Sequence, residues 1–445
     1  MAKVIKLLGT FHRVSEIIGM EHPYHYRNKV QAAFGTTRGG KIISGIFQSS
    51  SHRIVAVDEC LLEDKKADEI IVSIRKLLPS FKLTAYNEDT HRGFLRHVLV
   101  KRGFKSGEVM VVLVGGTNVF PRKKDFVKAL LKLHPEITTI VFNINTKKTS
   151  LVLGERQEVL YGSGKIMEEL LGCRFRISPK SFYQINPIQT EVLYSKALEF
   201  ADLKGSDKLL DAYCGIGTIG LIAASKVKSV VGVELNKDAV RDARENMKLN
   251  SIKNAEFHCA DAGEFMLEKK AAGENFDVVI MDPPRAGASK QFLSCLVKAS
   301  PERVVYVSCN PETQKRDLFY LTKAGYKVKK IQPVDMFPHT AHCETVVLLS
   351  KGEVDSKKIR VEFSLEDMDM SEFQDGATYP QIKEYVLEHT GLKVSSLYIS
   401  QIKRKCGLEV GKNYNLPKSE DSRQPQCPPE KEKAIREAFK YFGMI

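Results

Sequence analysis

The stretch Asp211-Ala-Tyr-Cys-Gly215-Ile-Gly217-Thr-Ile-Gly220 decides the fold of this chain. An apolar run precedes it and a helical pattern follows it, which predicts a strand, a glycine loop and a helix in succession. Glycines in such a loop let the backbone approach a ligand that larger residues would exclude. The spacing G-x-G-x-x-G at Gly215, Gly217 and Gly220 predicts a nucleotide-type site. Taken alone, this spacing suits a dinucleotide equally well.

The region around this loop, from about residue 206 to 350, alternates between predicted strands and helices. The predicted strands are 208–213, 229–235, 255–260, 276–281, 303–308, 326–333 and 344–349. This alternation predicts a Rossmann-like, doubly wound α/β sheet that is mostly parallel, with helices on both faces. Only a short loop separates the last two strands, so we expect them to form an antiparallel hairpin at one edge.

The residues outside this region predict two further parts. Residues 1–150 have the pattern of a mixed α/β domain, with a helix over 65–78 and a hairpin over 30–47. Residues 355–445 predict three helices, over 379–389, 395–405 and 429–442, with Ser395 as the N-cap of the second. The predicted boundaries are therefore 1–165 for an N-terminal α/β domain, 166–352 for the sheet domain and 353–445 for a C-terminal, helix-turn-helix-like module.

Charge and cysteine usage narrow the class of protein. The chain has a net charge of +14, and the basic surplus lies mostly in its first 200 residues, which indicates a polyanionic partner there. No apolar run approaches the roughly 20 residues that span a bilayer, and we find no signal peptide. Nine cysteines without pairing or zinc spacings fit a reducing cytoplasm. We expect a cytoplasmic monomer with no membrane attachment.

Two short segments mix aromatic and basic residues in a way that suits RNA. They are Tyr24-His-Tyr26-Arg27-Asn28-Lys29 and Arg92-Gly-Phe94-Leu-Arg96-His97. RNA bases stack on aromatic rings while phosphates pair with cations. Such mixtures also occur at ordinary domain edges, so both interpretations stay open.

Two carboxylates follow strands of the predicted sheet. Glu234 ends the second strand, where a carboxylate can accept both hydroxyls of a ribose. Asp282 follows the fourth strand in Met281-Asp282-Pro283-Pro284-Arg285, where the prolines stiffen the turn. Because ligands of open α/β sheets bind at the carboxyl ends of strands, we expect both side chains to face the site.

A cysteine at the end of the fifth strand carries the chemistry. Cys309 lies in Val-Ser-Cys309-Asn310-Pro311, and Glu344 starts the last strand after Cys343. Carbon 5 of uracil is unreactive toward a sulfonium until a thiolate adds at carbon 6 and makes an enolate. A base must later remove the carbon-5 proton, and Glu344 is the candidate, with His339 and His342 as rivals. The constellation therefore predicts a methyltransferase that acts on carbon 5 of a pyrimidine.

Together these residues resemble the RNA 5-methyluridine methyltransferases, specifically the bacterial 23S ribosomal RNA (uracil-5-)-methyltransferases. The resemblance runs from about residue 17 to 350 and includes Ser178-Pro-Lys-Ser-Phe-Tyr183-Gln184-Ile-Asn186-Pro187. It implies an S-adenosylmethionine-dependent enzyme with Cys309 as nucleophile, Glu344 as base and RNA as partner, bound in part by the basic N-terminal domain. It also implies cofactor contacts, besides the loop glycines Gly215 and Gly217, at Gln184, Tyr213, Thr218, Glu234, Asp261 and Asp282.

The chain departs from the family pattern in two places. Relatives commonly begin with an oligonucleotide-binding barrel and three cysteines of an iron–sulfur site, and this chain begins after both. Cys60 resembles the fourth ligand without its partners, so we expect no iron–sulfur cluster and no metal. The C-terminal helical module lies outside the usual family core.

Several functions remain open at this point. The leading hypothesis is methylation of uridine carbon 5 in 23S ribosomal RNA, with transfer RNA as the nearest alternative target. Cytosine methylation is disfavoured, because its enzymes place Pro-Cys where this chain has Pro284-Arg285. A nonenzymatic RNA-binding assembly factor would fit the basic front, and a DNA-binding regulator would rest on residues 377–406 alone.

Overall fold

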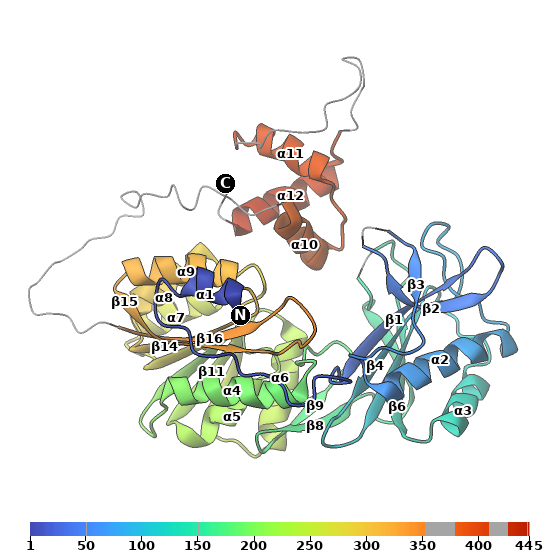
Figure 1. The fold of residues 1–445 in the computed structure, drawn as a ribbon, viewed down its shortest axis with the longest axis horizontal. Helices are drawn as coiled ribbons and strands as arrows, with labels where there is room; N and C mark the ends of the chain where they lie inside the picture. Colours follow the sequence, from blue (N-terminus) through green and yellow to red (C-terminus); the bar gives the residue numbers. More distant parts are fainter. Residues whose placement is uncertain (50, 150, 352–378, 409–425, 443, 445) are drawn as a thin grey trace, which may run out of the picture. The chain divides into compact units, whose positions relative to one another are not determined.

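The computed structural model describes residues 1–49, 51–149, 151–351, 379–408, 426–442 and 444 (Figure 1). The chain divides into two compact units. One holds two seven-stranded sheets and nearly all residues up to 352, and the other holds the three C-terminal helices. Among the described residues, no helix combines the length and apolar character needed to cross a bilayer.

The first sheet belongs to the N-terminal part of the larger unit. Its strands, in spatial order, are β3 (Ile54–Ala56), β2 (Ile42–Phe47), β1 (Lys29–Thr36), β4 (Leu95–Arg102), β5 (Val109–Gly115), β6 (Ile137–Ile144) and β7 (Arg156–Tyr161). The antiparallel pairing of β1 with β2 confirms the predicted hairpin. Helices α2 (Lys65–Ser80) and α3 (Lys123–Leu133) pack beside each other on this sheet and close one apolar core (Figure 1).

The second sheet contains the glycine loop. Its spatial order is β12 (Ala255–Cys259), β11 (Ser229–Glu234), β10 (Lys208–Ala212), β13 (Val278–Met281), β14 (Arg303–Ser308), β16 (Glu344–Lys351) and β15 (Tyr326–Val334). The first five strands are parallel, and β16 runs antiparallel to both β14 and β15. This order confirms the doubly wound sheet and the antiparallel hairpin at its edge.

Helices cover both faces of the second sheet, as the alternating pattern predicts. Figure 1 shows α4 (Pro187–Ala201), α5 (Thr218–Ala223) and α6 (Lys237–Leu249) on one face. It shows α7 (Ala262–Ala271), α8 (Lys290–Ala299) and α9 (Pro311–Lys323) on the other. A short 3-10 turn, η1 (Ala224–Lys226), follows α5. The central strands β10, β11, β13 and β14 are almost fully buried, which explains their continuous apolar runs.

The first 20 residues pack against the second sheet rather than the first. Helix α1 (Ala2–Leu8) buries Val4 and Leu8 and contacts α9. The chain then runs along β15, with isolated bridges from Val14 to Ile331 and from Ile18 to Val334. A separate hairpin, β8 (Ile166–Leu170) with β9 (Cys173–Ile177), packs on α6.

The smaller unit has its own apolar core. It consists of α10 (Tyr379–Thr390), α11 (Ser396–Lys405) and α12 (Pro429–Tyr441), which enclose Ile382, Ile399, Ile435 and Phe439 among others. The Ser395 side chain accepts a hydrogen bond from the backbone N–H of Tyr398, which confirms it as the N-cap of α11. The boundary predicted at residue 353 lies outside the described residues.

Candidate active site

The glycine loop joins β10 to α5 at the carboxyl edge of the sheet. Tyr213, Gly215 and Gly217 all have left-handed backbone conformations, with φ of 64°, 54° and 83°. A Cβ at Gly217 would lie 2.8 Å from the Phe257 ring, whereas one at Gly215 would meet nothing within 4 Å. The loop is therefore tight on its inner side at Gly217 and open at Gly215, where a ligand can approach the backbone.

Glu234 lies beside this loop at the end of β11. Its Oε2 accepts a hydrogen bond from the Gly215 N–H at 3.2 Å, and its Oε1 accepts one from the Asn236 N–H at 2.9 Å. Each oxygen of an ionised carboxylate can accept a second bond, so lone pairs remain for two hydroxyl donors. The next residue, Leu235, is 66% exposed and offers an apolar surface beside the carboxylate.

The other predicted cofactor residues come from neighbouring elements. The Asp261 side chain caps α7, because its Oδ1 accepts hydrogen bonds from the N–H groups of Gly263 and Glu264. Gln184 is buried just before α4. Asp282 follows β13, and burial raises the pKa of its carboxyl to about 7.

Tyr194 of α4 is a site residue that the sequence did not reveal. It is almost fully buried, and the side chains of Thr218 and Gln184 act to lower the pKa of its phenol. Burial and the nearby charge of Asp282 raise the pKa of the Tyr194 phenol well above its usual value. The signal that indicates this helix is Asn186-Pro187, an N-cap followed by a first-turn proline.

Cys309 and Glu344 meet at the end of the ladder between β14 and β16. The last paired residues of the ladder are Ser308 and Thr345, so the register places Cys309 opposite Glu344. Glu344 is 4% exposed. Burial, Glu344 and Asp282 raise the pKa of the Cys309 thiol to about 12, against an opposing effect of Arg285. Burial and Asp282 likewise raise the pKa of Glu344, and Arg285 again opposes them.

The turns that hold these groups are joined by hydrogen bonds. Asn310 caps α9 and donates from its side-chain amide to the carbonyl oxygen of Arg285 at 3.1 Å. The Thr313 hydroxyl donates to the same oxygen at 3.2 Å. The Asp282–Arg285 turn and the Cys309 turn therefore form one rigid edge of the site.

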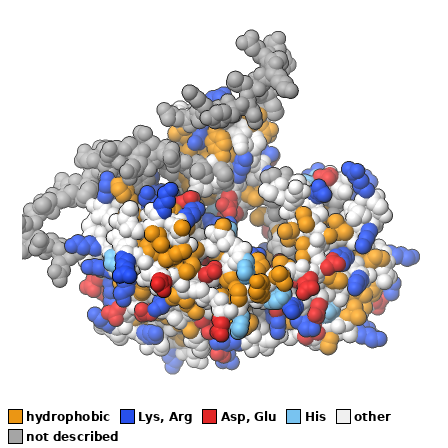
Figure 2. Space-filling view, in the orientation of Figure 1, with side chains coloured by type: hydrophobic (Ala, Val, Ile, Leu, Met, Phe, Trp, Pro, Cys, Tyr) orange, Lys and Arg blue, Asp and Glu red, His pale blue; other side chains and the backbone are white. Residues whose placement is uncertain are grey.

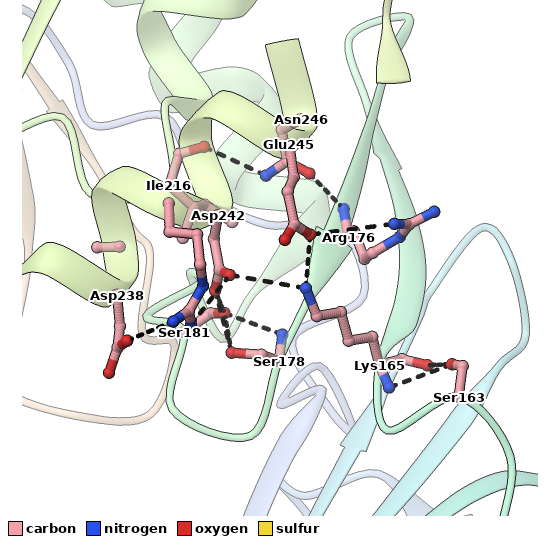
Figure 3. Close-up of polar contacts among 12 residues, drawn as sticks. Ser163, Lys165, Arg176, Ser178, Ser181, Ile216, Asp238, Asp242, Glu245 and Asn246 are labelled. Carbon is pink, nitrogen blue, oxygen red and sulfur yellow. Dashed lines mark hydrogen bonds and ion pairs between the residues drawn. The ribbon is translucent and has the colours of Figure 1, made fainter. Parts of the chain in front are cut away.

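A buried polar network connects the two sides of the nucleotide-type site (Figure 3). Asp242 of α6 accepts hydrogen bonds from the hydroxyls of Ser178 at 3.1 Å and Ser181 at 2.8 Å. One turn later, Asn246 donates to the Ile216 carbonyl oxygen of the glycine loop at 3.2 Å. One face of α6 thus holds both the glycine loop and the turn that leads to Gln184.

Lys101 completes this network from the first sheet. Its ammonium group donates to the carbonyl oxygens of Ser178 and Ser181, each at 2.9 Å. Burial lowers the pKa of Lys101 to about 7. The segment before Gln184 is therefore held from β4 as well as from α6.

The two aromatic and basic segments differ in exposure. Phe94, Arg96 and His97 are all buried, and Arg96 pairs with Glu88 at 2.9 Å. Burial lowers the pKa of His97 to about 4. The aromatic ring and the later basic residues of the second segment are therefore part of the interior and offer no RNA surface, whereas Arg92 is exposed. In the first segment Tyr26 is buried, whereas Tyr24 is 52% exposed.

Neither rival base is buried with Cys309. His339 and His342 are exposed residues of the loop before β16, and His339 stacks on Tyr24. Lys and Arg side chains are scattered among acidic ones on the face shown in Figure 2, and they do not merge into one basic patch.

The thiols do not gather into a metal site within the described parts of the chain. No cluster of three or more His, Cys, Asp or Glu residues with ligand geometry occurs there. Cys60 lies before α2, and its backbone N–H donates to Asp68. The expected absence of an iron–sulfur cluster remains a prediction.

The fold and this edge define a methyltransferase-type α/β enzyme. A family model described as tRNA (uracil-5-)-methyltransferase matches residues 7–352, and the chain belongs to that family. An RNA methyltransferase of Clostridium tetani is 42% identical over 347 residues, covering 78% of this chain and 75% of its own. An RNA methyltransferase of Halalkalibacterium halodurans is 44% identical over 336 residues, which cover 76% of this chain and 73% of that protein.

A solved structure supports the same assignment. The crystal structure of Pyrococcus abyssi tRNA (uracil-54, C5)-methyltransferase with S-adenosyl-L-homocysteine matches with a TM-score of 0.66 and 32% identity. The match covers 78% of this chain and 81% of that one. The protein is thus an S-adenosylmethionine-dependent RNA methyltransferase.

The residues present fit the methyl donor. Glu234 keeps acceptor positions for ribose hydroxyls, Leu235 provides apolar surface, and the space beside Gly215 is open. The cofactor-binding roles of Gln184, Tyr213, Thr218, Asp261 and Asp282 remain predictions.

Proposed function

We propose that this protein methylates carbon 5 of uridine in RNA, with Cys309 as nucleophile and Glu344 as base. The observation that carries the proposal is that both residues adjoin the Ser308–Thr345 pair, which ends the β14–β16 ladder. A thiol and a buried carboxyl group at the end of two neighbouring strands can react with two neighbouring atoms of a planar ring. The exposed positions of His339 and His342 favour Glu344 over either histidine.

The first step is addition of the Cys309 thiolate to carbon 6 of the uracil. The new S–C bond uses the sulfur electron pair, and the electrons of the carbon 5–carbon 6 double bond move to carbon 5 and the carbonyl at carbon 4. Carbon 5 then has the nucleophilic character that uracil lacks. Asp282, which raises the pKa of Glu344, is the candidate for a contact with the uracil ring.

The second step forms the carbon–carbon bond and restores the ring. The sulfonium of the donor supplies the methyl group, and S-adenosylhomocysteine leaves with the electron pair of the broken S–C bond. Glu344 then removes the carbon-5 proton, the double bond forms again, and the Cys309 thiolate is expelled. The proton taken up by Glu344 then returns to the expelled Cys309 thiolate, and the proton that the Cys309 thiol lost before its addition is the one released to solvent.

The electrostatics of the site favour a neutral resting state. Because burial and the acidic neighbours raise the pKa of Cys309 to about 12, the free enzyme holds a thiol rather than a thiolate. Arg285 opposes this effect, and a cationic donor bound at the same edge would act in the same direction. Thiolate formation is thereby linked to the presence of the methyl donor.

We propose 23S ribosomal RNA as the target, on the sequence motifs that resemble those enzymes. Transfer RNA is the second candidate, and the likeness to the Pyrococcus abyssi tRNA enzyme supports it. A nonenzymatic assembly factor is disfavoured, because such a role does not require Cys309 and Glu344 to face each other. Mass spectrometry of digested ribosomal and transfer RNA, with and without the gene, distinguishes these outcomes through the loss of 5-methyluridine from one RNA, the other or neither.

A further inference from the structure

The loop between β15 and β16 begins and ends at the proposed catalytic edge of the sheet. Val334 at the end of β15 pairs with Glu344 at the start of β16, so both ends of the loop lie at the proposed base. His339 is in this loop, five residues from Glu344. At about 3.4 Å per residue, its Cα lies within roughly 17 Å of that of Glu344.

Three side-chain hydrogen bonds hold this loop from other elements. The Tyr26 hydroxyl donates to the Pro338 carbonyl oxygen at 3.0 Å. The side-chain amides of Asn186 and Gln189 donate to the carbonyl oxygens of Met336 and Asp335, each at 3.0 Å. The loop is therefore fixed before any ligand arrives, and fixed groups lose little entropy when they bind.

An aromatic pair lies on this fixed loop. The rings of Tyr24 and His339 are stacked, with centroids 4.7 Å apart and an interplanar angle of 20°. The backbone around Tyr24 is anchored, because the N–H groups of His25 and Arg27 donate to the carbonyl oxygens of Leu61 and Leu62. Tyr24 nevertheless remains 52% exposed.

An exposed, anchored aromatic ring beside a catalytic edge suits one kind of ligand in particular. Proteins that hold single-stranded RNA stack its bases on such rings, and this stacking does not depend on base identity. The substrate class here is RNA. A base that flanks the target nucleotide is therefore the planar group that this surface is placed to receive.

We propose that Tyr24 and His339 form a stacking platform for a base that flanks the target uridine. This inference rests on the proposed function, because the Cys309 adduct defines the position of the target. The platform acts on substrate binding rather than on the chemical step. Stacking is present equally before and during the reaction, so its loss raises KM and leaves kcat unchanged.

The test uses short single-stranded RNAs with one 5-fluorouridine and one 2-aminopurine, moved through the three positions on either side. The fluorouridine adduct with Cys309 fixes the register, and quenching of 2-aminopurine reports stacking. We expect one flanking position to be quenched with the wild-type protein and with Tyr24→Phe. With Tyr24→Ala and His339→Asn we expect quenching to fall at least twofold at that position. Asn replaces His339 because it tolerates the left-handed backbone there, φ 63°.

Affinity gives a second readout that does not need the adduct. The same RNAs with ordinary uridine, titrated with protein, should bind Tyr24→Ala at least fivefold more weakly than wild type. Tyr161→Ala, at an exposed tyrosine of β7, is the matched control and should bind as wild type does. Equal quenching and equal affinity for Tyr24→Ala and wild type would overturn the platform. Absence of any adduct with wild-type protein would instead overturn the proposed function, and the titration would still decide on the platform.

Discussion

Cys309 directly follows, and Glu344 directly precedes, the Ser308–Thr345 pair that ends the β14–β16 ladder, so both residues lie at the same end of it. Their proximity depends on the antiparallel direction of β16. In an antiparallel pair, the end of one strand meets the start of the next, whereas a parallel strand would bring its far end to this edge. The antiparallel hairpin at the edge thus brings a thiol and a carboxyl group to the same end of a doubly wound sheet.

Replacement of Cys309 by Ala should abolish methyl transfer, by at least about a thousandfold, because no other group can activate carbon 5. Affinity for S-adenosylmethionine, measured by calorimetry, should stay within about twofold of wild type, since the thiol makes no predicted cofactor contact. Cys259→Ala, at an exposed thiol, is the control and should remain active. Full activity of Cys309→Ala would sink the covalent mechanism.

Replacement of Glu344 by Gln should stop the reaction after methyl transfer. Loss of a general base typically costs about a hundredfold to ten-thousandfold in rate. A methylated protein–RNA adduct should then accumulate on ordinary RNA and appear as a slower band on a denaturing gel. His342→Asn should turn over without such an adduct. If instead the Glu344 variant keeps the wild-type rate, the base is another group.

Alkylation of Cys309 should show the electrostatic effect of Glu344. Burial and then the Glu344 carboxylate raise the thiol pKa to about 12. A negative neighbour disfavours the thiolate, so Glu344→Gln should lower the thiol pKa and speed the reaction with iodoacetamide at the alkaline pH values at which Glu344 is ionised. The control is Glu312→Gln, at an exposed carboxylate three residues beyond Cys309, and it should leave the alkylation rate unchanged. The rate at each pH is read by mass spectrometry of the peptide, and identical profiles for both variants would contradict the assignment.

Replacement of Glu234 by Gln should weaken binding of S-adenosylmethionine by about ten- to a hundredfold. This range corresponds to hydrogen bonds to a charged acceptor worth about 1.5–3 kcal/mol. The control is Glu256→Gln, at an exposed carboxylate of the neighbouring strand. An unchanged dissociation constant for Glu234→Gln, measured by calorimetry, would show that the ribose lies elsewhere.

Replacement of Asp242 by Ala should also weaken cofactor binding, although Asp242 is not a predicted cofactor contact. The change removes the acceptor of the Ser178 and Ser181 hydroxyls and frees the turn that leads to Gln184. We expect about a tenfold rise in the dissociation constant, measured well below the unfolding temperature. Asp238→Ala, on the exposed side of the same helix, should have no effect. If both variants bind alike, the network supports stability alone.

The central strands of the second sheet, β10, β11, β13 and β14, were predictable because they are buried on both faces and read as apolar runs. Helix α4 could not be predicted from its sequence pattern, because its buried residues include Gln189 and Thr190 as well as Leu193 and Tyr194. With polar residues inside, the helix has no clear apolar stripe. The sequence pattern therefore did not indicate that Tyr194 lies close to Gln184 and Thr218.

The residues around Arg96 were interpreted as a possible RNA surface for a related reason. A buried Arg needs a carboxylate, and Glu88 supplies it from across a tight turn in which Asn87 accepts hydrogen bonds from Asp89 and Thr90. Sequence composition records the cation and the aromatic rings but not which of them face inward. The same limit applies to the first segment, in which only the fold separates the buried Tyr26 from the exposed Tyr24.

The bridges from Val14 to Ile331 and from Ile18 to Val334 have a consequence for self-association. A strand at the border of a sheet presents unpaired backbone groups that can recruit another chain. Here the N-terminal segment occupies part of that border on β15, next to the strand that carries Glu344. The first residues of the chain thus cover part of this edge and limit intermolecular β-pairing at the hairpin that carries Glu344.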